Sequence, residues 1–185
     1  MRKILVSEMV TVDGFFAGTN GELDWFGQDE ALDTFALDLL ESVDTLLYGR
    51  ATYEMMAGFW PDAPGSFAER TNQLEKIVFS TTLKETPWGQ WKNARPLQGN
   101  IVEEVAKLKH QTGRDMMIYG SGSIVQALTN HDLIDEYHLV VNPVVLGSGK
   151  PLFENIKERV NLELISTKAF KSGMVVLSYQ PERKE

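Results

Sequence analysis

The stretches LLYGRATYE, residues 46–54, and MMIYGSGSIVQAL, residues 116–128, each lead from an apolar strand through glycine into the start of a helix. A helix N-terminus exposes unpaired backbone N–H groups and a partial positive charge, and glycine allows a phosphate to approach the backbone closely. We therefore predict two anion sites. The first is formed by Gly49, Arg50 and Thr52, and the second by Gly120, Ser121, Gly122 and Ser123.

Arg50 is the most informative residue of the first site, because a cation at a helix start opposes the helix dipole. A bound anion would remove this cost. The alternative is a local ion pair with Glu54 on the next turn, and Thr52 is equally compatible with a helix cap. For the second site the alternative is a tight turn in which Ser123 is the N-cap. The segment also lacks the third glycine of the usual dinucleotide-binding fingerprint.

Strands and helices alternate through most of the chain, which predicts an α/β fold with a mainly parallel sheet and helices on both faces. The strand-like segments are residues 4–12, 45–49, 75–80 and 116–119, and the helical ones are 29–41, a segment from 51, 101–111 and 123–129. Residues 136–142, 162–170 and 174–180 are again strand-like, and 171–173 form a turn between the last two. The sheet is therefore expected to end in antiparallel strands.

Length and composition fit one domain over residues 1–185, with 43% hydrophobic residues for its core. A formal net charge of −8 argues against nucleic-acid binding, and the absence of cysteine excludes disulfides and thiolate chemistry. No signal-peptide pattern or long apolar span is present, so a cytoplasmic protein without a membrane partner is expected. His110, His131 and His138 lack both metal-ligand spacing and an evident serine partner, and no metal is expected.

Two protein families resemble this sequence over nearly its whole length. GRATYE, residues 49–54, and YGSGS, residues 119–123, resemble the corresponding stretches of dihydrofolate reductases. SEMVTVDGFFA, residues 7–17, and DEYHLVVNPVVLGSGKPLF, residues 135–153, are more similar to the reductase domain of the bifunctional riboflavin-biosynthesis enzyme and its stand-alone relatives. This resemblance implies a three-layer α-β-α fold of the dihydrofolate reductase type. The zinc deaminase half of the bifunctional enzyme is absent from the sequence.

The resemblance also implies a cofactor site for NADPH across the carboxyl ends of the central strands. Arg50 would lie near the 2′-phosphate and Thr52 near the pyrophosphate. Ser80 and Thr81 match a hydroxyl-bearing turn beside the adenosine. The segment 120–123 would hold the pyrophosphate against the helix that starts near Ser123. This mapping agrees with the two anion sites inferred from the helix starts.

The substrate side rests on four residues. Asp13 matches a carboxylate expected near the substrate in riboflavin-type reductases, although a turn residue before Gly14 is the alternative. Asp33 lies in the region where folate reductases carry a pterin-binding carboxylate. Phe16 and Trp25 are candidates for stacking on a flat heterocycle or on the nicotinamide, or else belong to the core.

These residues predict an oxidoreductase that transfers a hydride from NADPH to a pteridine-like or pyrimidine-like small molecule, with Asp13, Asp33 or water delivering the proton. One alternative is an NADPH-binding or ligand-sensing protein without efficient catalysis. Another is a structural domain in which Gly49 and Gly120 only form turns. The riboflavin-type resemblance further implies a homodimer, with the late apolar strands as a possible contact.

Overall fold

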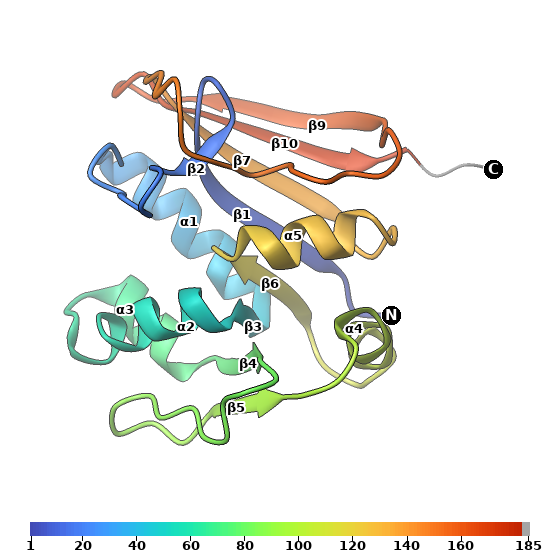
Figure 1. The fold of residues 1–185 in the computed structure, drawn as a ribbon. Helices are drawn as coiled ribbons and strands as arrows, with labels where there is room; N and C mark the ends of the chain where they lie inside the picture. The colour runs from blue at the N-terminus through green and yellow to red at the C-terminus, as the bar shows by residue number, and fades with distance from the viewer. Residues whose placement is uncertain (183–185) are drawn as a thin grey trace.

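The computed structural model describes residues 1–182 and contains one eight-stranded sheet with the order β5-β4-β3-β6-β1-β7-β10-β9 (Figure 1). Its strands are β1 (Ile4–Thr11), β3 (Val43–Gly49), β4 (Glu75–Phe79), β5 (Ala94–Leu97), β6 (Asp115–Tyr119), β7 (Glu136–Asn142), β9 (Leu162–Ala169) and β10 (Val175–Pro181). A separate pair is formed by β2 (Phe15–Ala17) and β8 (Lys150–Pro151), which are antiparallel.

The six strands from β5 to β7 run parallel to their neighbours, and β10 and β9 close the sheet in antiparallel fashion. The predicted mixed, mostly parallel sheet with antiparallel C-terminal strands is therefore confirmed. Parallel order brings the carboxyl ends of β1, β3 and β6 to the same edge, where open α/β sheets bind their ligands.

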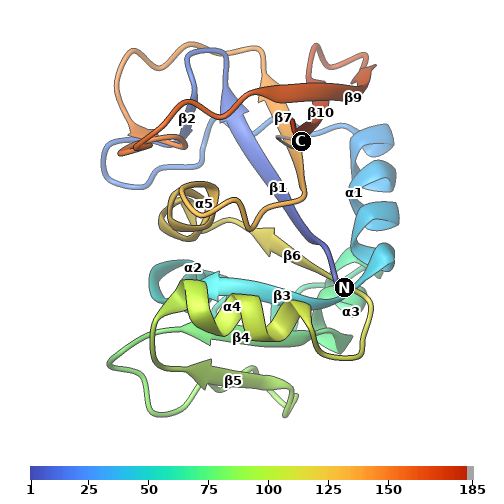
Figure 2. The ribbon, with the colours of Figure 1, turned by 90° about the vertical axis from the view of Figure 1, so that its right-hand side faces the viewer.

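Helices cover both faces of the sheet, so the three-layer α-β-α arrangement is confirmed (Figure 2). The helices are α1 (Glu30–Ser42), α2 (Arg50–Ala57), α3 (Ser66–Gln73), α4 (Ile101–Lys109) and α5 (Gly122–Thr129), with a 3-10 turn at Trp60–Asp62. On one face α4 and α5 pack against Ile4, Val6 and Ile118. On the other, α1, α2 and α3 pack against Leu5, Leu46 and Met117.

Several elements differ from the sequence-based expectation. Helix α3 has the sequence SFAERTNQ, and of its residues only Ala68, Thr71 and Asn72 are buried, so it lacks an apolar stripe to predict it. Strand β5 contains Pro96, which is tolerated because β5 is an edge strand. Helix α5 begins at Gly122, and its N-cap is Ser121 in a left-handed conformation, so Ser123 is not the cap.

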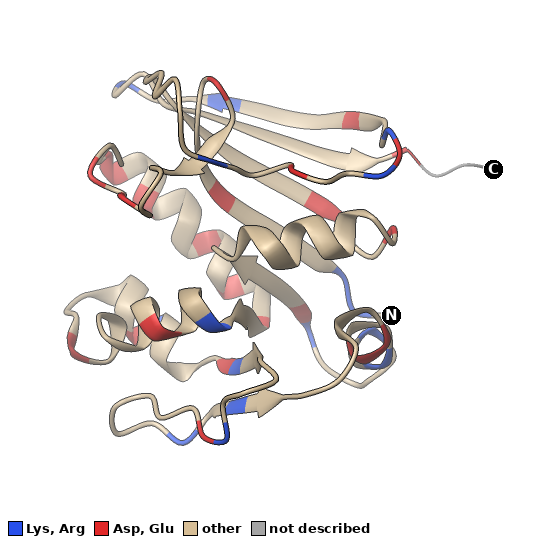
Figure 3. Cartoon of the chain, viewed as in Figure 1, with Lys and Arg blue, Asp and Glu red and all other residues tan. Residues whose placement is uncertain are grey.

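Basic and acidic residues are interspersed along the ribbon in Figure 3. No helix within residues 1–182 is both long and apolar enough to cross a bilayer.

Candidate active site

The starts of helices α2 and α5 lie against each other at the carboxyl edge of the sheet. The hydroxyl of Ser121 accepts a hydrogen bond of 2.9 Å from the backbone N–H of Gly49. Gly120 has a φ of 80°, and a Cβ added there would lie 2.7 Å from Cγ2 of Thr52. Glycine at this position therefore permits both the left-handed backbone and the close approach of the two helices.

Arg50 lies at the first position of α2, and its side chain is half exposed. Its guanidinium forms an ion pair of 2.8 Å with Glu54 and donates a hydrogen bond of 2.9 Å to Oγ1 of Thr82. The local ion pair that sequence left as an alternative is thus formed, and Figure 3 shows the blue and red segments together on α2.

The hydroxyl-bearing turn after β4 lies beside Arg50. The Ser80 hydroxyl accepts hydrogen bonds from the backbone N–H groups of Thr82 and Leu83 and lies 3.3 Å from the Thr82 hydroxyl. Thr81 is exposed in the same turn. The guanidinium is therefore hydrogen-bonded to Thr82 rather than to either hydroxyl that the sequence singled out.

A cavity of about 830 Å³ opens at this edge of the sheet. Its lining combines residues 7–9 of β1, strand β2 with the segment after it, the first half of α1, helix α2, the start of α3 and residues 119–123. The volume and the mainly apolar lining with a few polar groups are typical of small-molecule sites. A larger hollow of about 1170 Å³ lies at the opposite edge, where β1 and β7 begin, and is lined mostly by charged and polar surface residues.

Two of the predicted substrate residues, Phe16 and Asp33, line the cavity. The Phe16 ring packs so closely on Gly122 that a Cβ added to that glycine would lie 2.6 Å from the ring carbons Cε1 and Cζ. Trp25 is not among the lining residues. Its indole N–H donates to the backbone carbonyl of Glu22, and its ring packs edge-on against Phe26, which does line the cavity.

Asp13 lies outside the cavity lining, on the exposed turn between β1 and β2. Its carboxylate accepts hydrogen bonds from the Thr11 hydroxyl at 2.7 Å and from the backbone N–H groups of Leu146 and Gly147. The Thr11 hydroxyl lowers the pKa of Asp13, burial opposes this effect, and the N–H groups of Gly147 and Leu146 lower the pKa further. The geometry matches a turn residue that fastens the 146–147 loop.

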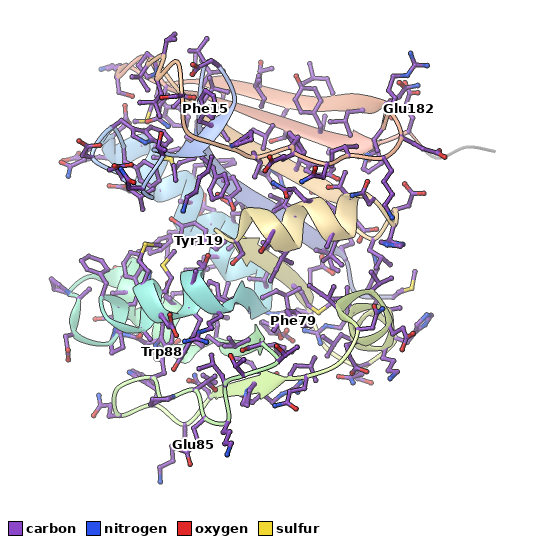
Figure 4. The ribbon with its side chains drawn as sticks, viewed as in Figure 1. Phe15, Phe79, Glu85, Trp88, Tyr119 and Glu182 are labelled. Carbon is purple, nitrogen blue, oxygen red and sulfur yellow. The ribbon has the colours of Figure 1, made fainter. Side chains whose placement is uncertain are left out.

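Sequence reasoning missed Glu8 and Tyr119, which both line the cavity. Glu8 is 6% exposed, and burial raises its pKa to about 8, against the opposing effect of the Gly120 backbone N–H. Tyr119 ends β6 between α1, α2 and α5 (Figure 4). Burial, followed by the charges of Glu8 and Asp33, raises the pKa of Tyr119 to about 12. The available signal was a carboxyl side chain within the apolar strand ILVSEMVT.

His138 is a residue of strand β7 and has a serine partner that was not evident from the sequence. Its Nδ1 lies 2.9 Å from the hydroxyl of Ser178, and its Nε2 lies 3.3 Å from Glu136. Burial lowers the pKa of His138, against the opposing effect of Glu136. Ser178 comes from strand β10, and Glu136 comes from β7, the strand of His138 itself. His138 is not part of the cavity lining.

Known proteins resemble this chain both in sequence and in structure. The chain is 38% identical over 183 residues to "Uncharacterized protein YyaP" of Bacillus subtilis (strain 168), covering 96% of this chain and 94% of that protein. The "Putative riboflavin biosynthesis protein" from Shewanella sp. PV-4 is similar in structure, with a TM-score of 0.82 and 28% identity over 99% of this chain and 100% of that one.

Dihydrofolate reductase from Enterococcus faecalis, complexed with NADP(H), shares the fold with a TM-score of 0.67 and 17% identity, over 98% of this chain and 97% of that one. Residues 2–176 match the model of the RibD C-terminal domain. The chain therefore belongs to the RibD C-terminal domain family.

Proposed function

We propose that this protein is an NADPH-dependent reductase that transfers a hydride to a pteridine-like or pyrimidine-like small molecule. The observation that carries the proposal is the junction of α2 and α5 at the wall of the 830 Å³ cavity, with the carboxyl groups of Glu8 and Asp33 lining the same space. Membership of a reductase family and the likeness to a dihydrofolate reductase complexed with NADP(H) add support.

The residues at the junction fit a dinucleotide cofactor. Gly120 lacks the Cβ that would collide with Thr52, and the N-terminus of α5 opens on the cavity through Gly122 and Ser123. These features suit a pyrophosphate held by backbone N–H groups at two helix starts. When bound, the reduced nicotinamide supplies a hydride, which no side chain of the protein can supply.

Arg50 is the residue that we assign to the 2′-phosphate. Its guanidinium already has an anionic partner in Glu54 and a hydroxyl partner in Thr82, so it is held near the start of α2 before any ligand binds. Ser80 and Thr81 would then contact the adenosine ribose. A phosphate next to Arg50 would compete with Glu54 for the guanidinium, which retains enough N–H donors to bind both.

The substrate is assigned to the part of the cavity lined by Phe16 and Asp33. Phe16 offers a flat apolar ring, and Asp33 projects from the first turn of α1. A flat heterocycle with polar edges suits this combination of an aromatic surface and a carboxylate. Asp13, hydrogen-bonded outside the lining, has no role in this proposal.

Nucleotide titration of the purified protein tests the proposal. We would follow tryptophan fluorescence during addition of NADPH or NADH, because Trp60 lines the cavity. We expect NADPH to bind more tightly than NADH. Arg50→Ala should weaken NADPH binding by about tenfold or more and leave NADH binding nearly unchanged, since a tenfold change needs only about 1.4 kcal/mol.

Arg95→Ala is the matched control. Arg95 also forms an ion pair of 2.8 Å with a neighbouring carboxylate, Glu75, and is similarly exposed, but it lies on β5 outside the cavity lining. Removal of the Arg95 side chain should leave the affinities for NADPH and NADH unchanged. If wild-type protein binds neither nucleotide, the reductase proposal fails; if both arginine variants weaken both nucleotides equally, the assignment of Arg50 fails.

We also propose that two copies of the chain pair through β9. This strand is the edge of the sheet, all of its residues after Leu162 are exposed, and Leu164 and Ile165 are 53% and 48% exposed. An edge strand that shows apolar side chains favours pairing with another strand. Light scattering should report a dimer at micromolar concentration, and Ile165→Lys should shift it toward monomer. A wild-type monomer would contradict this.

A further inference from the structure

Glu8 is a carboxyl group inside the cavity that the proposed function leaves without a task. It follows Ser7, the last residue of β1 that pairs with β6, so its backbone lies where these two strands separate. Its side chain lines the cavity but is only 6% exposed. Within residues 1–182, its Oε1 atom is inaccessible to solvent and has no hydrogen-bond partner.

An unpartnered buried carboxyl group is much less costly as a neutral acid than as an anion, because the charged form loses its hydration. The structure provides little to offset that loss. The Gly120 backbone N–H favours the anion, but no cation within residues 1–182 contributes to stabilising it, and burial keeps the pKa of Glu8 at about 8. Glu8 is therefore expected to carry a proton at neutral pH, and a group bound in the cavity could accept that proton.

The other titratable groups around Glu8 do not change this conclusion. Besides Glu8, the cavity lining contains Asp33 on α1, Tyr119 at the end of β6 and Lys150 on β8. Asp33 is exposed. Burial, followed by the charges of Glu8 and Asp33, raises the pKa of Tyr119, so its hydroxyl holds its proton more tightly. Lys150 lies beside Gly21, and its positive charge contributes to lowering the pKa of the exposed Glu22 carboxyl group.

We propose that Glu8 is the general acid of the site, which donates a hydrogen bond and then its proton to an acceptor atom of the bound heterocycle. This inference rests on the proposed function. The acceptor is the nitrogen of a C=N bond or the oxygen of a C=O bond, and its carbon takes the hydride of the reduced nicotinamide. The double bond becomes a single bond with new C–H and N–H or O–H bonds, and Glu8 is left as a carboxylate that solvent reprotonates.

The position of Glu8 also defines the class of ligand. A buried neutral acid without a cationic neighbour in the described part of the chain favours an uncharged acceptor, because a ligand anion would find no basic partner there. Asp33 differs, since its side chain is exposed to water at the cavity. The two carboxyl groups thus give one site a proton donor and a separate anionic group, as paired acids do in other enzymes.

Glu8→Gln tests the proposal, because glutamine keeps the size and neutrality of the protonated side chain but cannot release a proton. Glu103→Gln on α4 is the control, since Glu103 is exposed and lies outside the cavity lining. The assays are NADPH binding by tryptophan fluorescence, and NADPH oxidation with dihydrofolate, other reducible pteridines and pyrimidines as acceptors. Both variants should bind NADPH within about twofold of wild type.

With any acceptor that wild type reduces, Glu8→Gln should lower kcat by about a hundredfold or more, the size of a general-acid contribution. The fall of kcat as pH rises through about 8 should disappear in this variant and remain in Glu103→Gln. Glu8→Met, which cannot hydrogen-bond through a polar end group, should show the same loss. Undiminished kcat in Glu8→Gln, with NADPH still bound, would overturn the acid role and leave the reductase proposal intact.

Infrared spectroscopy gives a readout that needs neither cofactor nor substrate. The C=O band of a protonated carboxylic acid should be present near pH 7 in wild type and Glu103→Gln, fade as pH rises through about 8, and be missing in Glu8→Gln. A band that persists in Glu8→Gln would overturn the proposal. Failure of wild type to bind NADPH would instead overturn the proposed function, so the two failures are distinguishable.

Discussion

The hydrogen bond of 2.9 Å from the backbone N–H of Gly49 to the hydroxyl of Ser121 joins the beginnings of two helices that lie 72 residues apart in the chain. Ser121 adopts a left-handed backbone, which aims its side chain at the other turn rather than at its own helix, and it forms no side-chain cap. The N–H donors of both helices are therefore brought to one place, where a single anionic ligand can reach them.

Gly120→Ala should disrupt this junction. The substitution places a methyl group 2.7 Å from Cγ2 of Thr52 and strains a backbone with a φ of 80°. We expect a loss of about 1–3 kcal/mol in the free energy of unfolding from the strained backbone, together with at least tenfold weaker NADPH binding. Denaturant unfolding and fluorescence titration measure the two effects.

Gly147→Ala separates backbone strain from the collision with Thr52. Gly147 has a similar φ of 75°, but a Cβ added there meets no atom within 4 Å. It should show a comparable loss of stability and normal NADPH affinity. Equal nucleotide affinity in the two variants would mean that the approach of α2 to α5 does not shape the cofactor site.

Sequence alone predicted the parts of the site that depend on local order along the chain. The turns at Gly49 and Gly120 can be predicted from the local order of a strand, a glycine and a helix start. Because β3 and β6 are parallel neighbours, the two turns then lie at the same edge of the sheet. The order of the strands in the sheet was not predicted, because periodicity does not say which strands pair. Helix α3 escaped prediction because its buried residues Thr71 and Asn72 are polar.

Side chains whose partners are distant in sequence were harder to place. Asp13 looked like a substrate contact, and two of the N–H groups that donate to its carboxylate lie in a loop more than 130 residues further on. Glu8 resembled a polar interruption of an apolar strand, and only the separation of β1 from β6 reveals the space that its side chain borders. The surroundings of Asp13 and of Glu8 therefore depend on tertiary contacts that the local sequence does not reveal.

Asp13→Asn should lower the melting temperature and leave NADPH affinity and kcat unchanged. The amide has one oxygen, so it cannot accept from Thr11, Leu146 and Gly147 as the carboxylate does. The lowered pKa of Asp13 means that its stabilisation is present above pH 3.8, its ordinary value, and is lost as pH falls through the folded-state pKa. The difference in melting temperature between variant and wild type should therefore shrink in acid. A fall in kcat at unchanged stability would return Asp13 to the mechanism.

Lys76→Met should alter how stability depends on pH. Lys76 is fully buried, donates to the backbone carbonyl of Asn72 at 2.7 Å and lies over the Trp88 ring, yet burial lowers its pKa to about 7. Between pH 7 and 10.5 the unfolded chain binds this proton and the folded chain does not, so wild-type stability rises with pH relative to the variant.

The rise should amount to roughly a few kcal/mol across that window, since each pKa unit corresponds to about 1.4 kcal/mol. Denaturant unfolding of both proteins between pH 7 and pH 9.5 measures it, and the comparison cancels the titration of groups that they share. Methionine keeps the volume, and the Asn72 carbonyl keeps its hydrogen bond from Asn93. Parallel stability curves would indicate that Lys76 remains protonated in the fold.

Gly122→Ala and Phe16→Leu should be coupled. A methyl group on Gly122 would lie 2.6 Å from two carbons of the Phe16 ring, and Gly122 has no positive φ, so the cost arises from this contact alone. We expect Gly122→Ala to lose about 1–3 kcal/mol of stability, as overpacking usually does, because the ring has to move into the cavity that it lines. The displaced ring should also reduce NADPH affinity.

Phe16→Leu removes the atoms that collide, so the double variant should be more stable than the sum of the single changes by about 0.5–3 kcal/mol. Denaturant unfolding of the four proteins gives this coupling energy. Strictly additive losses would mean that Phe16 leaves Gly122 readily and does not form a fixed wall of the site.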